Sequence, residues 1–124
     1  MKSLLTTPLV LLALLAPLYA GADFDKGVAA YEAEDYVTAA QEFKKAAEQG
    51  IAQAQYNLAL SYALGIGVIQ DNVYAHMWYN IAASEGDETA KEERGNIAEQ
   101  MTLSQITEAQ KLARECVAKD YKGC

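Results

Sequence analysis

The sequence of 124 residues has no proline after Pro17, a single histidine (His76) and only two cysteines. Without proline, nothing in residues 18–124 removes a backbone N–H and breaks a helix in that way. A lone histidine lacks the companions at ligand spacing that a zinc site needs, so we expect a structural or solvated His76 and no metal or cofactor. The S-x-x-K pattern of serine β-lactamases is also absent. Without these residues and motifs, the sequence contains no recognisable set of catalytic residues.

Basic residues are also scarce once the N-terminal segment is set aside. Nine lysines and arginines then face seventeen acidic residues, which gives a net charge of −8. This charge repels phosphate backbones and anionic lipid surfaces, so we expect neither nucleic acid nor a membrane surface as partner. A partner with basic patches is compatible with the charge but is not required by it.

Residues 1–22 have the pattern of a secretory signal peptide. Lys2 precedes an apolar run over 4–16 that is too short to span a bilayer, and Ala20-Gly21-Ala22 fits the small-x-small cleavage pattern. The alternative, a buried N-terminal helix, is disfavoured by Pro8 and Pro17. We therefore expect cleavage after Ala20 or Ala22. No cysteine follows the run, so we expect no lipid anchor and a soluble product in the periplasm or outside the cell.

The two cysteines, Cys116 and Cys124, both lie near the C-terminal end. In an oxidising compartment such a pair predicts one disulfide, and Gly123 lets the tail turn back. Closing so short a loop contributes roughly 2–3 kcal/mol in the chain-entropy model. A redox pair is the alternative, but its usual C-x-x-C spacing is missing.

Residues 23–124 are predicted to be helical nearly throughout, because apolar residues recur at three- and four-residue spacing. Gly50 and Gly86 lie where helices need a left-handed ending residue, and Asp87 can cap the next helix. Thr102 and Gln105 form a capping box before a final helix. The expected apolar stripes are Phe24, Val28 and Tyr31; Tyr36, Ala39, Ala40, Phe43, Ala46 and Ala47; Ile51, Ala54, Leu58 and Tyr62; Val73, Met77, Trp78, Tyr79 and Ile81; and Ile106, Ala109, Leu112, Ala113 and Cys116.

The stretch LGIGVIQD (64–71) contains two glycines and interrupts the helical pattern. A Walker loop needs a lysine after its last glycine, and a dinucleotide loop needs a third glycine where Gln70 stands. Both also need a preceding strand. The stretch is instead interpreted as a hairpin turn, in which Gly65 ends one helix, Gly67 reverses the chain and Asp71 caps the returning helix.

The chain also repeats itself. AAQEFKKAAEQG (39–50) aligns with AHMWYNIAASEG (75–86) at an offset of 36, and Tyr31 corresponds to Tyr62 at an offset of 31. The difference of five is the extra length of the glycine-containing turn. A period in the middle thirties with two helices per unit is typical of a helical solenoid.

Residues 54–87 resemble one full Sel-one-like repeat (SLR), a relative of the tetratricopeptide repeat (TPR). The matching positions are Ala54-Gln55, Leu58, Tyr62, Gly65, Gly67-Val68, Asp71, Ala75, Trp78-Tyr79, Ala82-Ala83 and Gly86-Asp87. Residues 24–50 look like a shortened repeat, 51–86 like a full one, and 87–124 like the closing helices of exported bacterial members. Ala59 and Leu103 depart from the family pattern, which usually has glycine and often has proline there.

The resemblance implies an all-α fold, a short right-handed α-solenoid of two antiparallel helix pairs over 23–124, closed by a C-terminal helix or helix pair. In such a stack the first helix of each unit lines an inner groove. The non-core positions on that helix include Leu60 and Leu64 and three polar candidates for partner binding, Gln53, Asn57 and Ser61. Acidic clusters at 32–35 and 87–93 are interpreted as serving helix dipoles and solubility.

The expected function is therefore that of an exported adaptor or scaffold that binds a protein partner and has no chemistry of its own. Two alternatives remain open. One is a cell-wall or β-lactam hydrolase, although relatives linked to such activity carry a cysteine pair in each repeat, which this sequence lacks. The other is a self-associating subunit, because a two-unit solenoid leaves end faces that can pair.

Overall fold

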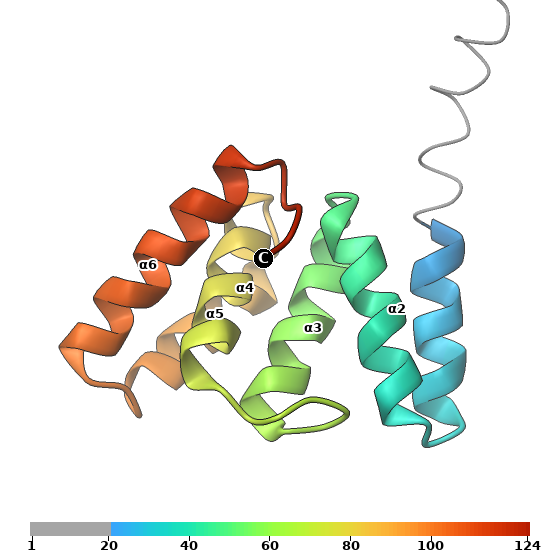
Figure 1. The fold of residues 1–124 in the computed structure, drawn as a ribbon. Coiled ribbons are helices and arrows are strands. Elements are labelled where there is room, and N and C mark those ends of the chain that lie inside the picture. Colours follow the sequence, from blue (N-terminus) through green and yellow to red (C-terminus); the bar gives the residue numbers. More distant parts are fainter. Residues whose placement is uncertain (1–20) are drawn as a thin grey trace, which may run out of the picture.

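The computed structural model describes residues 21–124, which form helices and no strand (Figure 1). Of the predicted leader only Gly21 and Ala22 belong to this range, so the rest of that prediction lies outside the described residues. No helix within 21–124 has the length and apolarity needed to cross a bilayer. The helices are the first helix (residues 21–32), α2 (Tyr36–Glu48), α3 (Ala52–Leu64), α4 (Asn72–Ser84), α5 (Glu88–Ala98) and α6 (Leu103–Ala118).

The helices follow one another in antiparallel order and are stacked side by side (Figure 1). The first helix pairs with α2 and α3 pairs with α4, whereas α5 and α6 both pack against α4. Helix α3 contacts α2 and α4, and α4 also contacts α5 and α6. The predicted all-α, solenoid-like fold is confirmed, and the element that closes it is a helix pair.

Side-chain caps fix where the helices begin. The carboxylates of Asp35, Asp71 and Asp87 each accept a hydrogen bond from the backbone N–H three residues later. Thr102 and Gln105 form the predicted capping box at the start of α6. Each cap satisfies an N–H that the helix itself leaves without a partner. The residue at which each of these helices begins is therefore determined by capping residues that can be recognised in the sequence.

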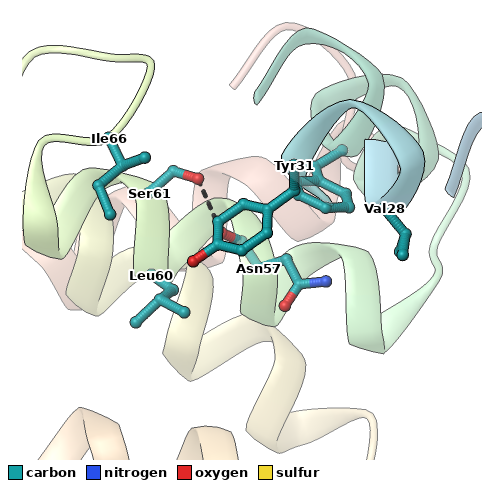
Figure 2. A pocket seen from close by; sticks show the side chains of 7 residues that line it. Val28, Tyr31, Asn57, Leu60, Ser61 and Ile66 are labelled. Atoms are coloured by element: carbon teal, nitrogen blue, oxygen red, sulfur yellow. Dashed lines mark hydrogen bonds between the residues drawn. The ribbon is translucent and has the colours of Figure 1, made fainter. Parts of the chain in front are cut away.

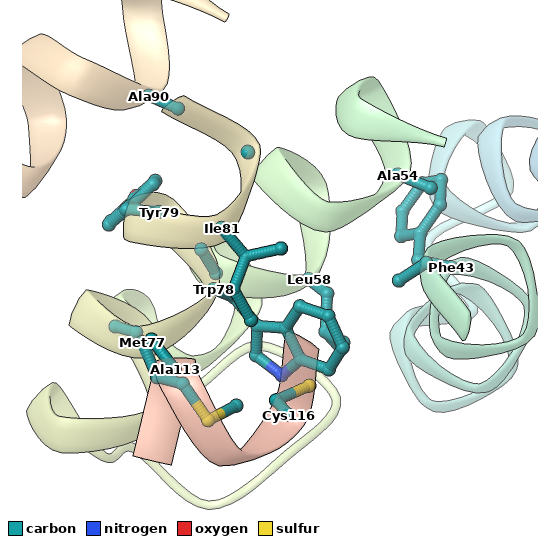
Figure 3. Packing of buried hydrophobic residues seen from close by; sticks show 14 of the residues in the cluster. Phe43, Ala54, Leu58, Met77, Trp78, Tyr79, Ile81, Ala90, Ala113 and Cys116 are labelled. Carbon is teal, nitrogen blue, oxygen red and sulfur yellow. The ribbon is translucent and has the colours of Figure 1, made fainter. Parts of the chain in front are cut away.

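The core is centred on α4 (Figure 3). Its Met77, Trp78, Tyr79 and Ile81 are all about 1% exposed, and Leu58 of α3 is equally buried. Alanines fill most other core positions, which lets neighbouring helices approach closely. Burying each large apolar side chain contributes about 1.5–3 kcal/mol. The middle hairpin therefore holds the stack together.

The first hairpin differs in detail from the predicted stripe. Gly27 is the buried residue of the first helix, and a Cβ there would lie 2.6 Å from ring carbons of Phe43. Tyr31, predicted to belong to the apolar stripe, is 45% exposed and packs its ring edge against Tyr36. The glycine lets the first helix lie directly on Phe43, and Phe24 and Val28 of the predicted stripe pack against the core, while Tyr31 remains at the surface.

The C-terminal tail folds back over the ends of the earlier hairpins. A disulfide joins Cys116 to Cys124, as predicted from their positions. Between them the Tyr121 hydroxyl donates to Glu85, and Lys122 Nζ donates to the carbonyl of Glu48. The tail thus connects the closing helix to the turns after α2 and α4.

Candidate functional site: the groove along helix α3

The stretch 64–71 is a turn between two helices. Gly65 ends α3 with a φ of 67°, Gly67 has a φ of 79°, and the Asp71 N–H donates to the carbonyl of Tyr62 over 2.9 Å. A Cβ at Gly67 would lie 2.1 Å from the carbonyl oxygen of Tyr36, so this turn is pressed against the first hairpin. The turn carries Ile66 to the edge of a hollow.

That hollow, called the anchor hollow here, has a volume of about 270 Å³ and lies between the first helix, α2 and α3. Figure 2 shows Tyr31 and Val28 on one side of it and the residues of α3 on the other. Apolar side chains make up most of its wall, and two polar residues interrupt it. Its lining residues are Val28, Tyr31, Phe43, Asn57, Leu60, Ser61 and Ile66.

Asn57 and Ser61, two of the three predicted binding residues, both line the anchor hollow. They lie one helical turn apart, and Ser61 Oγ donates to the carbonyl oxygen of Asn57 over 3.0 Å. The serine proton is therefore used within the helix, while its oxygen can still accept a hydrogen bond. The Asn57 amide offers both a donor and an acceptor. Together they provide the polar groups with which a groove can hold a peptide backbone.

The third predicted residue, Gln53, lies outside the anchor hollow. It is exposed and lines a second, shallower hollow between α3 and α5, the acidic hollow, of about 400 Å³. Leu60 belongs to the anchor hollow, and Leu64 is 59% exposed beyond its rim. The predicted residues therefore share one face of α3 but serve two hollows. The acidic hollow is lined by Ala52, Gln53, Tyr56, Glu85, Gly86, Asp87 and Thr89.

The charge on this face of the groove is exclusively negative. Helix α3 carries no charged residue, and the only charged residues lining the two hollows are Glu85 and Asp87. The pKa of Tyr56 is raised by burial and then by the carboxylates of Glu93 and Asp87. The Tyr56 hydroxyl therefore lies within the negative potential of the carboxylates at the α5 end of the groove.

Sequence reasoning missed four of the lining residues of the anchor hollow as site residues: Val28, Tyr31, Phe43 and Ile66. The first three come from the preceding hairpin and were assigned to its core stripes. Their role depends on how closely two hairpins stack, which periodicity does not report. The position of Ile66 between two glycines of a turn was the one available signal, because it implies an apolar side chain held at the surface.

His76 takes no part in the groove. It is 3% exposed within α4, and its pKa is lowered by burial and then by the nearby Arg94. Within residues 21–124 no three histidine, cysteine or acidic side chains lie close enough together to hold a metal ion. The chemistry that this surface offers is apolar contact, hydrogen bonding and negative charge.

Comparison with known proteins agrees with this architecture. The Sel1 repeat family model matches residues 27–51 and 52–87. A solved structure, that of a protective antigen present in uropathogenic Escherichia coli strains and described as displaying an SLR fold, superposes with a TM-score of 0.76. It is 28% identical over 82% of this chain, which spans 24% of the antigen chain. No curated protein matches the chain.

The first matched repeat contains the first helix–α2 hairpin from Gly27 onward, and the second contains the α3–α4 hairpin with its glycine turn. The predicted resemblance is confirmed. Sel1 repeats indicate a helical-repeat module for protein interaction, and the groove along α3 lies between the two matched repeats and α5. The chain is a Sel1-like repeat protein.

Proposed function

We propose that this protein is an exported, non-enzymatic adaptor that binds a segment of a partner protein along the groove of α3. The observation that carries the proposal is the anchor hollow, where apolar walls surround Asn57 and Ser61. Apolar pockets with a few placed polar groups are the usual form of a binding site. The partner segment would insert one side chain into the anchor hollow, and its backbone would form hydrogen bonds with Asn57 and Ser61.

Two features support a role without chemistry. Both cysteines of residues 21–124 are joined in the disulfide, so neither offers a thiolate nucleophile. His76, the one imidazole of the chain, is buried in the core and lines neither hollow. A general base has to reach the proton that it abstracts, directly or through one water.

Export is supported by the leader pattern of residues 1–22 and by the disulfide between Cys116 and Cys124. Disulfides persist in oxidising compartments such as the periplasm and the cell exterior. The structural neighbour is described as a protective antigen, which is compatible with export. We place this chain in the periplasm or outside the cell on these grounds.

The test uses the oxidised, purified protein to capture partners from an envelope extract, with identification by mass spectrometry and affinity measured on the purified partner. Asn57→Ala combined with Ser61→Ala should weaken binding about tenfold, because two hydrogen-bonding groups worth about 0.5–1.5 kcal/mol each are lost. The melting temperature should stay constant, since the Ser61 hydroxyl bonds only to its own helix.

The matched control changes a serine and an amide elsewhere, Ser104→Ala with Gln110→Ala, both exposed on α6. This pair should bind like the unchanged protein. If the α3 pair and the α6 pair bind equally well, the groove is not the site. If cell-wall fragments are retained and no protein is, a glycan-binding or hydrolytic role replaces the adaptor.

A further inference from the structure

We propose that the groove selects a cationic segment, one that carries an apolar side chain followed or preceded within two to four positions by lysine or arginine. This inference rests on the proposed function and adds the chemistry of the partner. The apolar side chain would fill the anchor hollow, and the basic side chain would lie in the acidic hollow nearer the start of α3.

The size of the anchor hollow suits a single side chain. Its volume of about 270 Å³ lies just below the range of pockets for whole small molecules, about 300–1,000 Å³. Val28, Leu60 and Ile66 supply aliphatic wall, and Phe43 and Tyr31 supply ring surface. An aliphatic or aromatic side chain matches such a wall, whereas a charged one would lose hydration without gaining a partner.

The charge of the acidic hollow selects the second residue. Glu85 and Asp87 line it, and Glu93 lies near enough to act on Tyr56. The ion pairs among residues 21–124 are Lys45 with Glu42 and Lys111 with Glu115, so these three carboxylates have no basic partner within salt-bridge distance. Neither hollow is lined by a lysine, arginine or histidine. An incoming basic side chain would therefore meet only negative charge.

The spacing follows from where the two hollows lie along α3, since Ala52, Gln53 and Tyr56 line the acidic hollow and Asn57, Leu60 and Ser61 line the anchor hollow. The two sets are centred about five to six residues apart, which is about 8 Å along a helix, and an extended peptide advances about 3.3 Å per residue. A segment that runs along α3 thus needs its basic residue about three positions from its anchor. Gln53 and Asn57 are one helical turn apart, so their amides can hydrogen-bond the peptide backbone in between.

The experiment measures fluorescence polarisation with labelled nine-residue peptides, acetylated and amidated so that their ends are neutral. Each carries one leucine or phenylalanine and, one to five positions away, lysine, arginine, glutamine or glutamate. At about 50 mM salt the lysine and arginine peptides should bind about three- to tenfold more tightly than the glutamine peptides at the favoured spacing, and glutamate should bind weakest. Raising the salt to about 300 mM should reduce this preference.

Glu85→Gln with Asp87→Asn should remove the preference for a basic residue, so that lysine, arginine and glutamine peptides bind this variant equally. Asparagine still caps α5, and glutamine still accepts the Tyr121 hydroxyl bond, so the fold is retained. The matched control, Glu99→Gln with Glu108→Gln, removes two exposed charges outside the groove and should keep the preference.

The outcomes separate the two proposals. If glutamine and lysine peptides bind equally, or if the control pair lowers the preference as much as the groove pair, the cationic selectivity is wrong while the adaptor role stands. If no peptide of any charge binds, while the unchanged protein is folded and oxidised, the peptide-binding groove itself is refuted.

Discussion

Replacing Gly67 by alanine tests how the groove is built. A Cβ at this position would lie 2.1 Å from the carbonyl oxygen of Tyr36 and 2.5 Å from its carbonyl carbon. Both atoms are backbone, so no side chain can rotate away. The residue also has a φ of 79°, in the left-handed region that alanine rarely adopts. The substitution therefore has to push the turn of residues 65–71 away from the first hairpin.

The magnitude combines two costs. Left-handed backbone costs a non-glycine residue about 1–2 kcal/mol, and overpacking a tight contact costs about 1–3 kcal/mol. Gly67→Ala should thus lower the free energy of unfolding by about 2–5 kcal/mol. Because Ile66 forms part of the anchor hollow, affinity for a groove-binding peptide should also fall.

Urea unfolding followed by circular dichroism gives the free energies, with two other glycines as references. Gly86 has a φ of 101° and open space around its Cβ position, so alanine there should cost only the backbone strain of about 1–2 kcal/mol. Gly95 lies inside α5 with open space, so alanine there should stabilise by about 0.5–1 kcal/mol. If Gly67→Ala costs no more than Gly86→Ala, the turn is not pressed against Tyr36 and the reasoning fails.

Three further predictions concern other parts of the fold. Replacing Cys116 and Cys124 by alanine should lower the free energy of unfolding by about 2–3 kcal/mol in urea titrations, and an unchanged midpoint would show that the tail needs no covalent closure. Burial and then Arg94 lower the folded-state pKa of His76, so the unfolded state binds its proton first. The contribution of neutral His76 to the free energy of unfolding is complete above about pH 6.5 and declines as the pH falls through that value. His76→Gln should therefore flatten the pH dependence of the free energy of unfolding in this range, and an identical pH dependence in both proteins would refute the prediction. Thr102→Ala should cost about 0.5–2 kcal/mol through loss of the capping box, whereas Thr107→Ala, an exposed threonine inside α6, should cost less.

Local features of the fold were predictable because they depend on neighbours in the chain. Asp71, Asp87 and Thr102 cap helices where the sequence indicates, and Gly65 ends α3 in the left-handed conformation. Capping and positive φ are governed by a few consecutive residues. The repeat resemblance supplied the order in which the hairpins stack.

Features that depend on the distance between hairpins were not predictable. Nothing in the local sequence marks Gly27 as a contact position, yet its missing side chain lets the first helix lie on Phe43, and Tyr31 of the same helix lines the anchor hollow. Gln53 and Asn57 share a helix face, and only the placement of the first helix and α5 assigns them to different hollows. Contacts of the tail with Glu85 and Glu48 likewise require residues far apart in the chain.

The central claim is that partners bind along α3. A titration of the ¹⁵N-labelled, oxidised protein with the tightest peptide of the library, followed by two-dimensional NMR, tests it most directly. We expect the largest shift changes on Tyr31, Gln53, Asn57, Ser61 and Ile66 and on the start of α5. Shift changes concentrated on α6 and the outer face of α4, with the α3 signals unmoved, would contradict it.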